Sequence, residues 1–225
     1  MTGIKQLLAF DFGASSGRAM LGRYDGNRID LEEIHRFAND PVMVGGTLFW
    51  DVLRLFHEVK QGLIKVKPHG QIDSLGIDTW GVDFGLIDDQ GYLLENPVHY
   101  RDTRTQGIMD EVFRTVPKDE LYQRTGTQFL NFNTLFQICS LKLQRPELLK
   151  RAAKLLLMPD LFLYLLTGRQ QAEFTIASTG QMINPRTGDW DFELLRRLDL
   201  PADILCPVVS PGTMAGLLSP AICSE

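Results

Sequence analysis

Cysteine and histidine are both scarce in this chain of 225 residues, which has three cysteines and four histidines. The cysteines are far apart, no Cys-x-x-Cys pair occurs, and the histidines show no metal-ligand spacing. The sequence therefore predicts neither a disulfide framework nor a zinc site. Cys139 lies in an apolar stretch and is predicted to be a core thiol. The other residues of these two kinds are Cys206, Cys223, His35, His57, His69 and His99.

Long hydrophobic runs are also lacking. The runs 155–158 and 161–166 are interrupted and far below the ~20 residues that span a bilayer, and the first six residues lack the layout of a signal peptide. The net charge is −5, and no stretch combines clustered Lys and Arg with aromatic residues. We therefore expect a cytosolic protein without a membrane or nucleic-acid partner. The length favours one large domain, and no linker divides the chain.

Two familiar phosphate-binding motifs are absent near the N-terminus, where no Gly-Lys-Ser/Thr and no Gly-x-Gly-x-x-Gly occurs. Residues 7–22 instead predict a strand, a tight turn and a second strand. The turn, Gly13-Ala14-Ser15-Ser16-Gly17, has small side chains, and successive turn amides make an anion-binding concavity. Arg18 adds a permanent cation, and Asp11 suits a hydrated Mg²⁺. The alternative is an ordinary polar hairpin with an incidental aspartate.

The remaining pattern predicts strands followed mainly by helices, without internal repeats. Asp160 is a candidate N-cap of a helix and Gly168 its C-cap, while Asp191 caps another helix. Residues 201–225 are rich in proline and predicted to be loop. The predicted strands are 5–10, 18–24, 29–37 and 72–77, and the predicted helices are 50–67, 108–114, 118–125, 134–145, 146–157, 161–166 and 192–198.

A second stretch with chemical character follows the strand 72–77. It reads Asp78-Thr79-Trp80-Gly81-Val82-Asp83-Phe84-Gly85. Asp78 and Asp83 supply carboxylates that bind paired hydroxyls, and Trp80 supplies an aromatic face for the C–H side of a sugar, around a bend at Gly81. The alternative is a β-bulge with a buried tryptophan and solvated acids.

Four motifs occur in a recognisable order: Asp-x-Gly-Ala-Ser-Ser-Gly-Arg, Gly-Ile-Asp-Thr-Trp-Gly-Val-Asp-Phe, Tyr-Arg-Asp-x-Arg-Thr, and Leu-Leu-Met-Pro-Asp-x-Phe-x-Tyr-x-Leu-Thr-Gly. Over residues 7–215 the chain resembles the N-terminal half of the FGGY carbohydrate kinases, which belong to the actin-like ATPase superfamily. The resemblance implies an α/β domain of ribonuclease-H-like fold, with flanking helices and a mixed β-sheet that begins in three antiparallel strands.

The resemblance also implies a reaction. It is the transfer of the ATP γ-phosphoryl group to a sugar hydroxyl, and the two most specific motifs point to O1 of L-rhamnulose. The turn residues Ala14, Ser15, Ser16, Gly17 and Arg18 would then face the ATP phosphates, with Asp11 near Mg²⁺. The ketose site would be lined by Gly81 and its neighbours Asp78, Trp80 and Asp83.

One departure from the family pattern concerns the catalytic base. In the family this base is an aspartate in a His-Asp-Thr-type motif, which does not occur in residues 1–225. The resemblance implies that the base lies beyond Glu225, so no residue of this chain is predicted to be catalytic. We therefore expect residues 1–225 to be the N-terminal domain, with the sugar site and the phosphate hairpin but without the base or the C-terminal adenosine-binding domain. The isolated chain is expected to be inactive.

Three alternatives remain open at this point. The chain could be an inactive fragment or a sugar-binding remnant. It could be a kinase for another deoxyketose such as L-fuculose. An actin-like fold can also serve as a non-enzymatic sugar sensor or as an ATP-switched module, because fold does not fix function.

Overall fold

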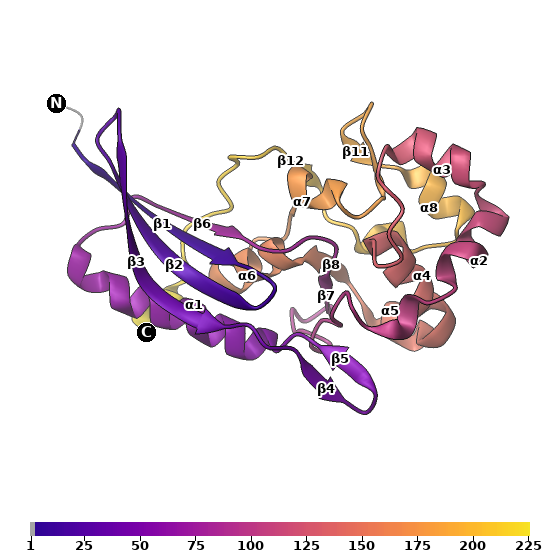
Figure 1. Cartoon of the computed structure of the whole chain (residues 1–225), viewed down its shortest axis with the longest axis horizontal. Coiled ribbons are helices and arrows are strands. Elements are labelled where there is room, and N and C mark those ends of the chain that lie inside the picture. Colours follow the sequence, from indigo (N-terminus) through magenta and orange to yellow (C-terminus); the bar gives the residue numbers. More distant parts are fainter. Residues whose placement is uncertain (1–2) are drawn as a thin grey trace.

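The N-terminal third of the chain forms a four-stranded mixed sheet. The structure is a computed structural model that describes residues 3–225. The strand order is β3-β2-β1-β6, with β1–β2 and β2–β3 antiparallel and β1–β6 parallel (Figure 1). The three antiparallel strands that the sequence predicted are therefore confirmed. The strands are β1 (Lys5–Phe12), β2 (Ser16–Tyr24), β3 (Ile29–Ala38) and β6 (Ser74–Asp78).

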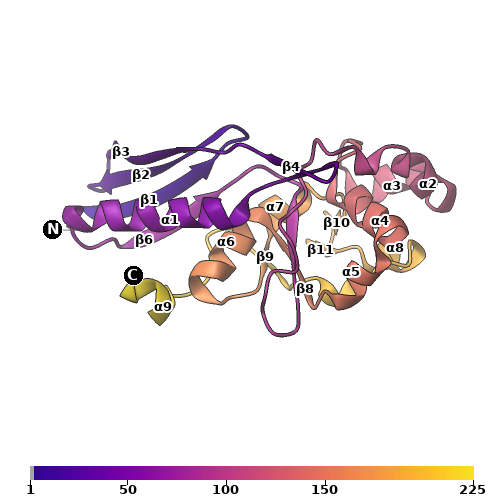
Figure 2. The same cartoon turned by 90° about the horizontal axis from the view of Figure 1, so that it is seen from below.

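Helices α1 (Val52–Val66) and α6 (Met158–Thr167) cover one face of this sheet, as Figure 2 shows. Alternate residues of β1 point to that face, because successive side chains of a strand point to opposite sides. Gly62 brings α1 so close that an added Cβ would lie 2.6 Å from the Phe10 ring. The Phe12 ring stacks on Phe162 of α6, with centroids 4.8 Å apart. Aromatic side chains of β1 therefore fill the contact between the sheet and these two helices.

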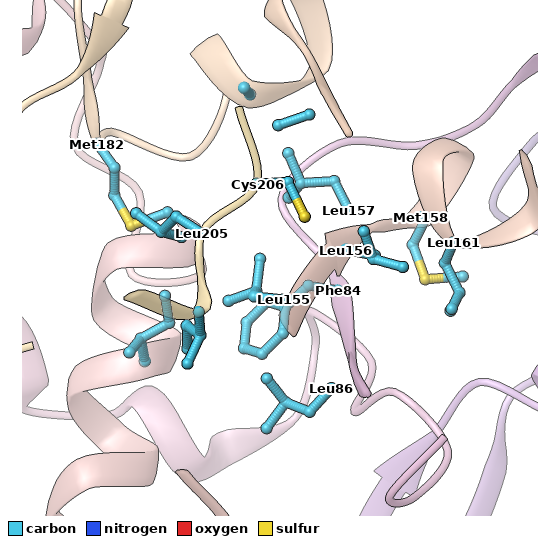
Figure 3. Close-up of a cluster of buried hydrophobic side chains, with 14 of the residues drawn as sticks. Phe84, Leu86, Leu155, Leu156, Leu157, Met158, Leu161, Met182, Leu205 and Cys206 are labelled. Atoms are coloured by element: carbon cyan, nitrogen blue, oxygen red, sulfur yellow. The ribbon is translucent and has the colours of Figure 1, made fainter. Parts of the chain in front are cut away.

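A second core region joins the sheet to the helical part of the chain. Here β7 (Phe84–Ile87) pairs antiparallel with β8 (Lys154–Leu157). Figure 3 shows the buried side chains that pack around this pair. Residues from both strands, from α6 and from residues 205–206 meet there. The labelled members are Phe84, Leu86, Leu155, Leu156, Leu157, Met158, Leu161, Met182, Leu205 and Cys206.

Strand β8 corrects the prediction of one helix over 146–157. The helix α5 (Pro146–Arg151) ends early, and Ala153 then donates its amide to the carbonyl of Ile87. Leu155, Leu156 and Leu157 are all buried. A short apolar run buried on both faces has no period that separates strand from helix, and pairing with β7 decides its conformation.

The other elements are mostly short, and most of the helices among them lie in the second half of the chain. The helical part contains α2 (Ile108–Thr115), α3 (Lys118–Thr125), α4 (Thr134–Gln144), α7 (Phe174–Ser178) and α8 (Phe192–Arg197). The paired short strands are β4 (Val42–Val44) with β5 (Thr47–Phe49), β9 (Ala172–Glu173) with β12 (Val208–Val209), and β10 (Ile183–Asn184) with β11 (Asp189–Trp190). Short 3₁₀ helices cover Lys67–His69, Thr103–Thr105 and Ala202–Ile204.

Arg124 and Asp191 tie α3 to α8. The guanidinium donates from Nε and Nη2 to the two carboxylate oxygens at 2.9 and 2.7 Å, while Asp191 also caps α8 by accepting from the Leu194 amide. Asp191 is 4% exposed. Burial alone would raise the pKa of Asp191. The hydrogen bonds from Arg124 and from backbone amides, together with the charge of Arg124, outweigh burial and hold that pKa below its ordinary value. The predicted cap is confirmed, and the ion pair was not foreseen.

The prediction of loop over residues 201–225 is wrong for parts of this segment. Ile204, Leu205 and Cys206 belong to the core, and β12 pairs in parallel with β9. The short helix α9 (Pro220–Ser224) follows, and Ile222 packs against the core. Several apolar residues of this segment therefore have partners within the chain, whereas Met214 and Leu217 remain exposed.

Glu225, the last residue, is tied to helix α1. Its carboxylate oxygen Oε2 accepts from Lys60 Nζ at 2.6 Å, and its amide donates to the Ile222 carbonyl at 3.4 Å. The C-terminal end accordingly lies beside α1 (Figure 1). The Glu225 side chain is 49% exposed, so this ion pair contributes at most about 1 kcal/mol. It nonetheless gives the end of the segment a defined contact that the predicted loop would lack.

Two further predictions concern α6 and Cys139. Gly168 takes the left-handed C-cap conformation with φ +77°, as predicted. Asp160 is not the N-cap, because α6 begins at Met158 with Leu157 as N-cap. Cys139 is buried in the core, as predicted. Within residues 3–225 the longest apolar helix falls short of what a membrane crossing requires.

Candidate active site

The predicted phosphate turn lies between β1 and β2 and is held by a residue that the sequence did not single out. The Gly13 amide donates to the Ser16 carbonyl at 2.9 Å. Asn39, which follows β3 and is 1% exposed, binds the turn twice. Its amide donates to the Ser15 carbonyl at 3.0 Å and its side chain to the Gly13 carbonyl at 2.7 Å. Gly13, Ala14 and Ser15 remain exposed at a turn of fixed shape.

Gly17 has a structural role at the end of this turn. It is buried, and an added Cβ would lie 2.3 Å from two atoms of the Phe37 ring. The close approach of β2 to Phe37 therefore requires glycine there whether or not a phosphate binds. A larger residue at this position would displace Phe37, so such a variant could lose activity without any loss of phosphate contact.

Asp11 and Arg18 face each other across the β1–β2 pair. Arg18 donates from Nε and Nη2 to one carboxylate oxygen of Asp11, at 2.9 and 2.8 Å. Both side chains are nearly half exposed. On the other side of β1, Asp78 is the register partner of Asp11 in β6. Two carboxylates thus sit side by side at the carboxyl ends of two parallel strands, a place where α/β sheets commonly bind ligands.

This pair of carboxylates fits Mg²⁺ better than a metal held by protein alone. Magnesium keeps several waters and usually takes one or two carboxylates together with phosphate oxygens. Over residues 3–225 no group of three His, Cys, Asp or Glu residues gathers closely enough to hold a metal ion. Asp11, with Asp78 as its register partner, has oxygen donors of the kind that a hydrated Mg²⁺ would need.

The bend at residues 79–83 has an unusual backbone. Val82 has φ +68°, a left-handed conformation that is an outlier for a β-branched residue. The Asp83 amide donates to the Gly81 carbonyl at 2.9 Å, which closes a three-residue turn. Thr134 of α4 donates to the Val82 carbonyl at 2.7 Å, and the Val82 amide donates to Thr179 Oγ1 at 3.2 Å. Surrounding side chains thus hold the strained bend in place.

Gly81 lies against Thr179. An added Cβ at Gly81 would lie 3.0 Å from Thr179 Oγ1, so the bend and the end of α7 approach as closely as glycine permits. Thr179 was not among the predicted residues. The local sequence around Thr179 gives little sign of this contact, because the bend lies far away along the chain.

Asp83 is buried rather than solvated. It is 1% exposed, and its carboxylate accepts from the indole Nε1 of Trp50 at 2.6 Å and of Trp80 at 3.1 Å. The Tyr100 amide and Gln137 Nε2 also donate to it, at 3.1 and 2.8 Å. Burial raises the pKa of Asp83 to about 6, although these hydrogen bonds oppose the shift. The structure brings Trp80 and Asp83 together, with four protein donors around the carboxylate.

Asp78 and Gly81 share a hollow of about 390 Å³ between the end of β6, the start of α6 and α7. Two acids that were not predicted for the site, Asp160 and Glu173, also line it. Asp160 is fully buried, and burial raises its pKa to about 7. The other lining residues are Ile77, Thr79, Pro159, Leu163, Thr175, Ile176, Thr179, Pro211 and Gly212.

The predicted site residues therefore fall into two groups. The turn 14–18, Asp11 and Asp78 gather at one end of the sheet, and Asp78 also borders the hollow together with Gly81. Trp80 and Asp83 are instead joined to Trp50, Tyr100 and Gln137, behind the bend. The hollow offers carboxylates that can accept hydroxyls, and the turn presents small, exposed residues at the end of the sheet.

The candidate site combines a polar turn, paired carboxylates and a hollow on a mixed sheet. This combination is the one expected of the N-terminal domain of a sugar kinase. The family profile for the FGGY family of carbohydrate kinases, N-terminal domain, matches residues 6–225. The chain belongs to this family.

Individual members of the family are also similar to this chain in sequence. The rhamnulokinase of Yersinia pestis bv. Antiqua (strain Angola) is 44% identical over 213 residues, which are 93% of this chain and 44% of that protein. The rhamnulokinase of Oceanobacillus iheyensis is 40% identical over 219 residues, 97% of this chain and 47% of that protein. The chain spans about half the length of the curated relatives it matches.

Solved structures confirm the fold. The ligand-bound xylulose kinase of Lactobacillus acidophilus superposes with a TM-score of 0.87 at 18% identity, over 98% of this chain and 45% of that one. The Plasmodium falciparum glycerol kinase with ADP gives 0.80 at 18% identity, over 99% and 46%. The actin-like α/β fold with a mixed sheet, which the sequence predicted, is thereby confirmed.

Proposed function

We propose that residues 1–225 form the sugar- and phosphate-binding domain of a kinase that transfers the ATP γ-phosphoryl group to O1 of L-rhamnulose. The observation that carries the proposal is the β1–β6 register, which places Asp11 beside Asp78 and links the phosphate turn to the hollow at Gly81. The names of the two rhamnulokinase relatives support the sugar. The proposal includes the cytosolic location expected from the sequence.

The chain's own residues have distinct roles in this proposal. The exposed amides and small side chains of residues 14–16 bind phosphate oxygens, and Arg18 contributes its charge at the exit of the turn. Asp11 and Asp78 hold the hydrated Mg²⁺ that accompanies ATP, which neutralises charge on the phosphates. Phosphoryl transfer is mainly positioning and charge stabilisation, so a fixed turn and a shaped sugar site are the main contribution expected of this half.

The sugar contacts are proposed at the bend and the hollow. Asp78 accepts sugar hydroxyls, and the absence of a side chain at Gly81 leaves room for the ketose beside Thr179. Trp80 supplies an aromatic surface. Asp83, whose oxygens already accept from four protein groups, acts on the sugar site through Trp80 rather than by direct contact.

The catalytic base is assigned to none of the acids described above, and the proposal keeps it beyond Glu225. Glu225 itself is paired with Lys60 on α1 and does not line the hollow at Gly81. Asp78 borders that hollow, but the proposal gives its carboxylate to Mg²⁺ and to sugar hydroxyls. Activation of the attacking hydroxyl is therefore proposed to come from outside residues 1–225.

The first test concerns the turn. Replacing the exposed Ser15 by aspartate places a negative charge where phosphate is proposed to bind. We expect Mg·ATP to bind about tenfold more weakly, the size of one like-charge repulsion at a partly exposed site. Calorimetric titration at low ionic strength measures this. Gln90→Glu, which adds the same charge in an exposed turn elsewhere, is the control, and equal affinities in the two variants would refute the phosphate assignment.

The second test concerns turnover. Residues 1–225 contain no His-Asp-Thr motif, and general-base assistance is typically worth ~10²–10⁴-fold. We therefore expect the isolated polypeptide to release ADP in the presence of L-rhamnulose at least ~100-fold more slowly than a complete rhamnulokinase assayed beside it. A coupled ADP assay at high protein concentration decides this. Comparable turnover would place the base within residues 1–225, with Asp78 the first residue to replace.

A further inference from the structure

Behind the bend at residues 79–83, a buried polar network connects two tryptophans to an arginine. Asp83 Oδ2 accepts from the indole nitrogens of Trp50 and Trp80 at 2.6 and 3.1 Å. Asp83 Oδ1 accepts from Gln137 Nε2 at 2.8 Å, and Gln137 Oε1 accepts from Arg104 Nη2 at 2.6 Å. Gln137 thus bridges the buried carboxylate to the guanidinium.

The hydrogen bonds of this network are not needed to pack the core. A buried carboxylate is costly unless hydrogen bonds and a compensating charge surround it, and an apolar residue of similar size could fill the same space. The carboxylate instead accepts both indole N–H groups on one oxygen, Oδ2. Such an arrangement fixes the rotation of both rings, which hydrophobic contact alone would leave free to adjust.

The ring whose position matters for a ligand is that of Trp80. One face of it stacks on Trp50, with centroids 3.8 Å apart, and Trp50 is itself fully buried and stacked on His99 at 3.9 Å. The Trp80 side chain remains partly exposed, and Gly81, which lines the hollow, follows it directly. Asp83 therefore holds a partly open aromatic ring in the residue next to Gly81, which lines the proposed sugar site.

We propose that Asp83, Gln137 and Arg104 are positioning residues that hold the Trp80 ring, and that this ring recognises the deoxy end of the sugar. The inference rests on the proposed function. A 6-deoxyketose such as L-rhamnulose ends in a methyl group, which gains by contact with an aromatic face, whereas L-fructose, its 6-hydroxy counterpart, must desolvate a hydroxyl there.

Two variants test the positioning role. Asp83→Asn replaces an oxygen that accepts by a nitrogen that donates. Either Gln137 or the three donors on Oδ2, which are the two indoles and the Tyr100 amide, then lose their acceptor. Trp80→Phe keeps an aromatic ring but removes the N–H that Asp83 holds, and it leaves the carboxylate with its three other donors. Trp190→Phe makes the same substitution at an indole that donates to the Cys206 carbonyl, outside this network, and serves as the control.

The first measurement is near-ultraviolet circular dichroism of the 225-residue chain, with far-ultraviolet spectra and thermal melts as checks on folding. The stacked Trp50–Trp80 pair should dominate the tryptophan signal. We expect Asp83→Asn to lose most of it while still melting cooperatively. An unchanged near-ultraviolet spectrum in a folded Asp83→Asn protein would overturn the positioning role. If Asp83→Asn does not fold, the selectivity of Trp80→Phe decides.

The second measurement is the ratio of the affinities for L-rhamnulose and L-fructose. We expect the unmodified chain to favour L-rhamnulose by ~10- to 100-fold, the range that an apolar contact supplies. Trp80→Phe and Asp83→Asn should lower this ratio about tenfold, and Trp190→Phe should leave it unchanged. A merely structural role would weaken both sugars alike and keep the ratio.

The outcomes separate this inference from the proposed function. If the unmodified chain binds neither sugar, the proposed function fails and sugar recognition by Trp80 fails with it, while the dichroism still decides whether Asp83 positions the ring. If the unmodified chain binds L-rhamnulose selectively and both variants keep the same ratio, the proposed function stands and this inference is overturned.

Discussion

Replacing Arg124 by methionine should lower the free energy of unfolding by about 3 kcal/mol or more at pH 7. The reason is that the variant leaves the buried carboxylate of Asp191 without its cationic partner. Asp191 has a side chain only 2% exposed, and both of its oxygens accept from Arg124. Without the guanidinium the buried charge keeps only the Leu194 amide among its strong donors. Denaturant unfolding at pH 7 measures the loss.

A matched control is available on the neighbouring helix. Arg114→Met breaks the ion pair with Glu111, in which both side chains are more than half exposed. Such surface pairs contribute little, so the change should stay within about 0.5 kcal/mol. Adding Asp191→Asn to Arg124→Met should recover part of the loss, since the unpaired charge is then gone. Equal stabilities of Arg124→Met and Arg114→Met would refute the account of this tie between α3 and α8.

The second large effect is an unusual dependence of stability on pH. Burial raises the pKa of Asp160 to about 7 and that of Asp83 to about 6, both well above the ordinary 3.8. The folded chain therefore binds these two protons more tightly than the unfolded chain does, and the contribution of both groups to stability grows as the pH falls from 8 towards 5.

His99 opposes this trend. Burial, with the nearby charge of Arg101, lowers its pKa from 6.5 to about 4. The unfolded chain then takes up this proton first, which favours unfolding below pH 6.5. With 1.36 kcal/mol for each pKa unit, the three groups together predict a gain on the order of 2 kcal/mol between pH 8 and pH 5.

Asp160→Asn isolates the largest of these contributions. The amide keeps the shape and an oxygen that can accept from the Glu173 amide, as Asp160 does, but it carries no charge to bury. We expect the variant to be more stable at pH 8 by on the order of 2 kcal/mol and nearly unchanged at pH 5. Asp203→Asn, at an exposed carboxylate, is the control. A loss of stability at pH 8 in Asp160→Asn would contradict this account.

The parts of the fold that the sequence predicted are those with a clear period or a decisive small residue. The three antiparallel strands alternate well, and the turn before β2 contains glycines and serines. The failures were at positions where the local pattern is ambiguous. Leu155–Leu157 fits strand and helix equally, and pairing with β7 decides it. Residues 204–206 look like loop, but distant partners bury them.

The candidate site likewise contains residues that the sequence predicted and residues that it did not. Asp11, the turn residues and the bend at Gly81 stand out because their residue types are unusual for their places. Asn39, Thr179 and Gln137 do not stand out, because each supports the site through hydrogen bonds to residues at least 24 positions away. Gly17 was singled out for space near a ligand, and the Phe37 ring turns out to require that space. Local sequence patterns identify the residues whose side chains suit a ligand. Contacts between distant parts of the chain decide which other side chains hold those residues in place.

The central claim is that this chain provides the L-rhamnulose-binding half of a kinase. Calorimetric titration of the 225-residue chain with L-rhamnulose, L-fuculose, L-ribulose and D-xylulose tests it most directly. The account predicts that L-rhamnulose binds most tightly and that replacing Asp78 by alanine weakens it. Tighter binding of L-fuculose or of either pentulose, or no binding of any of the four, would contradict it.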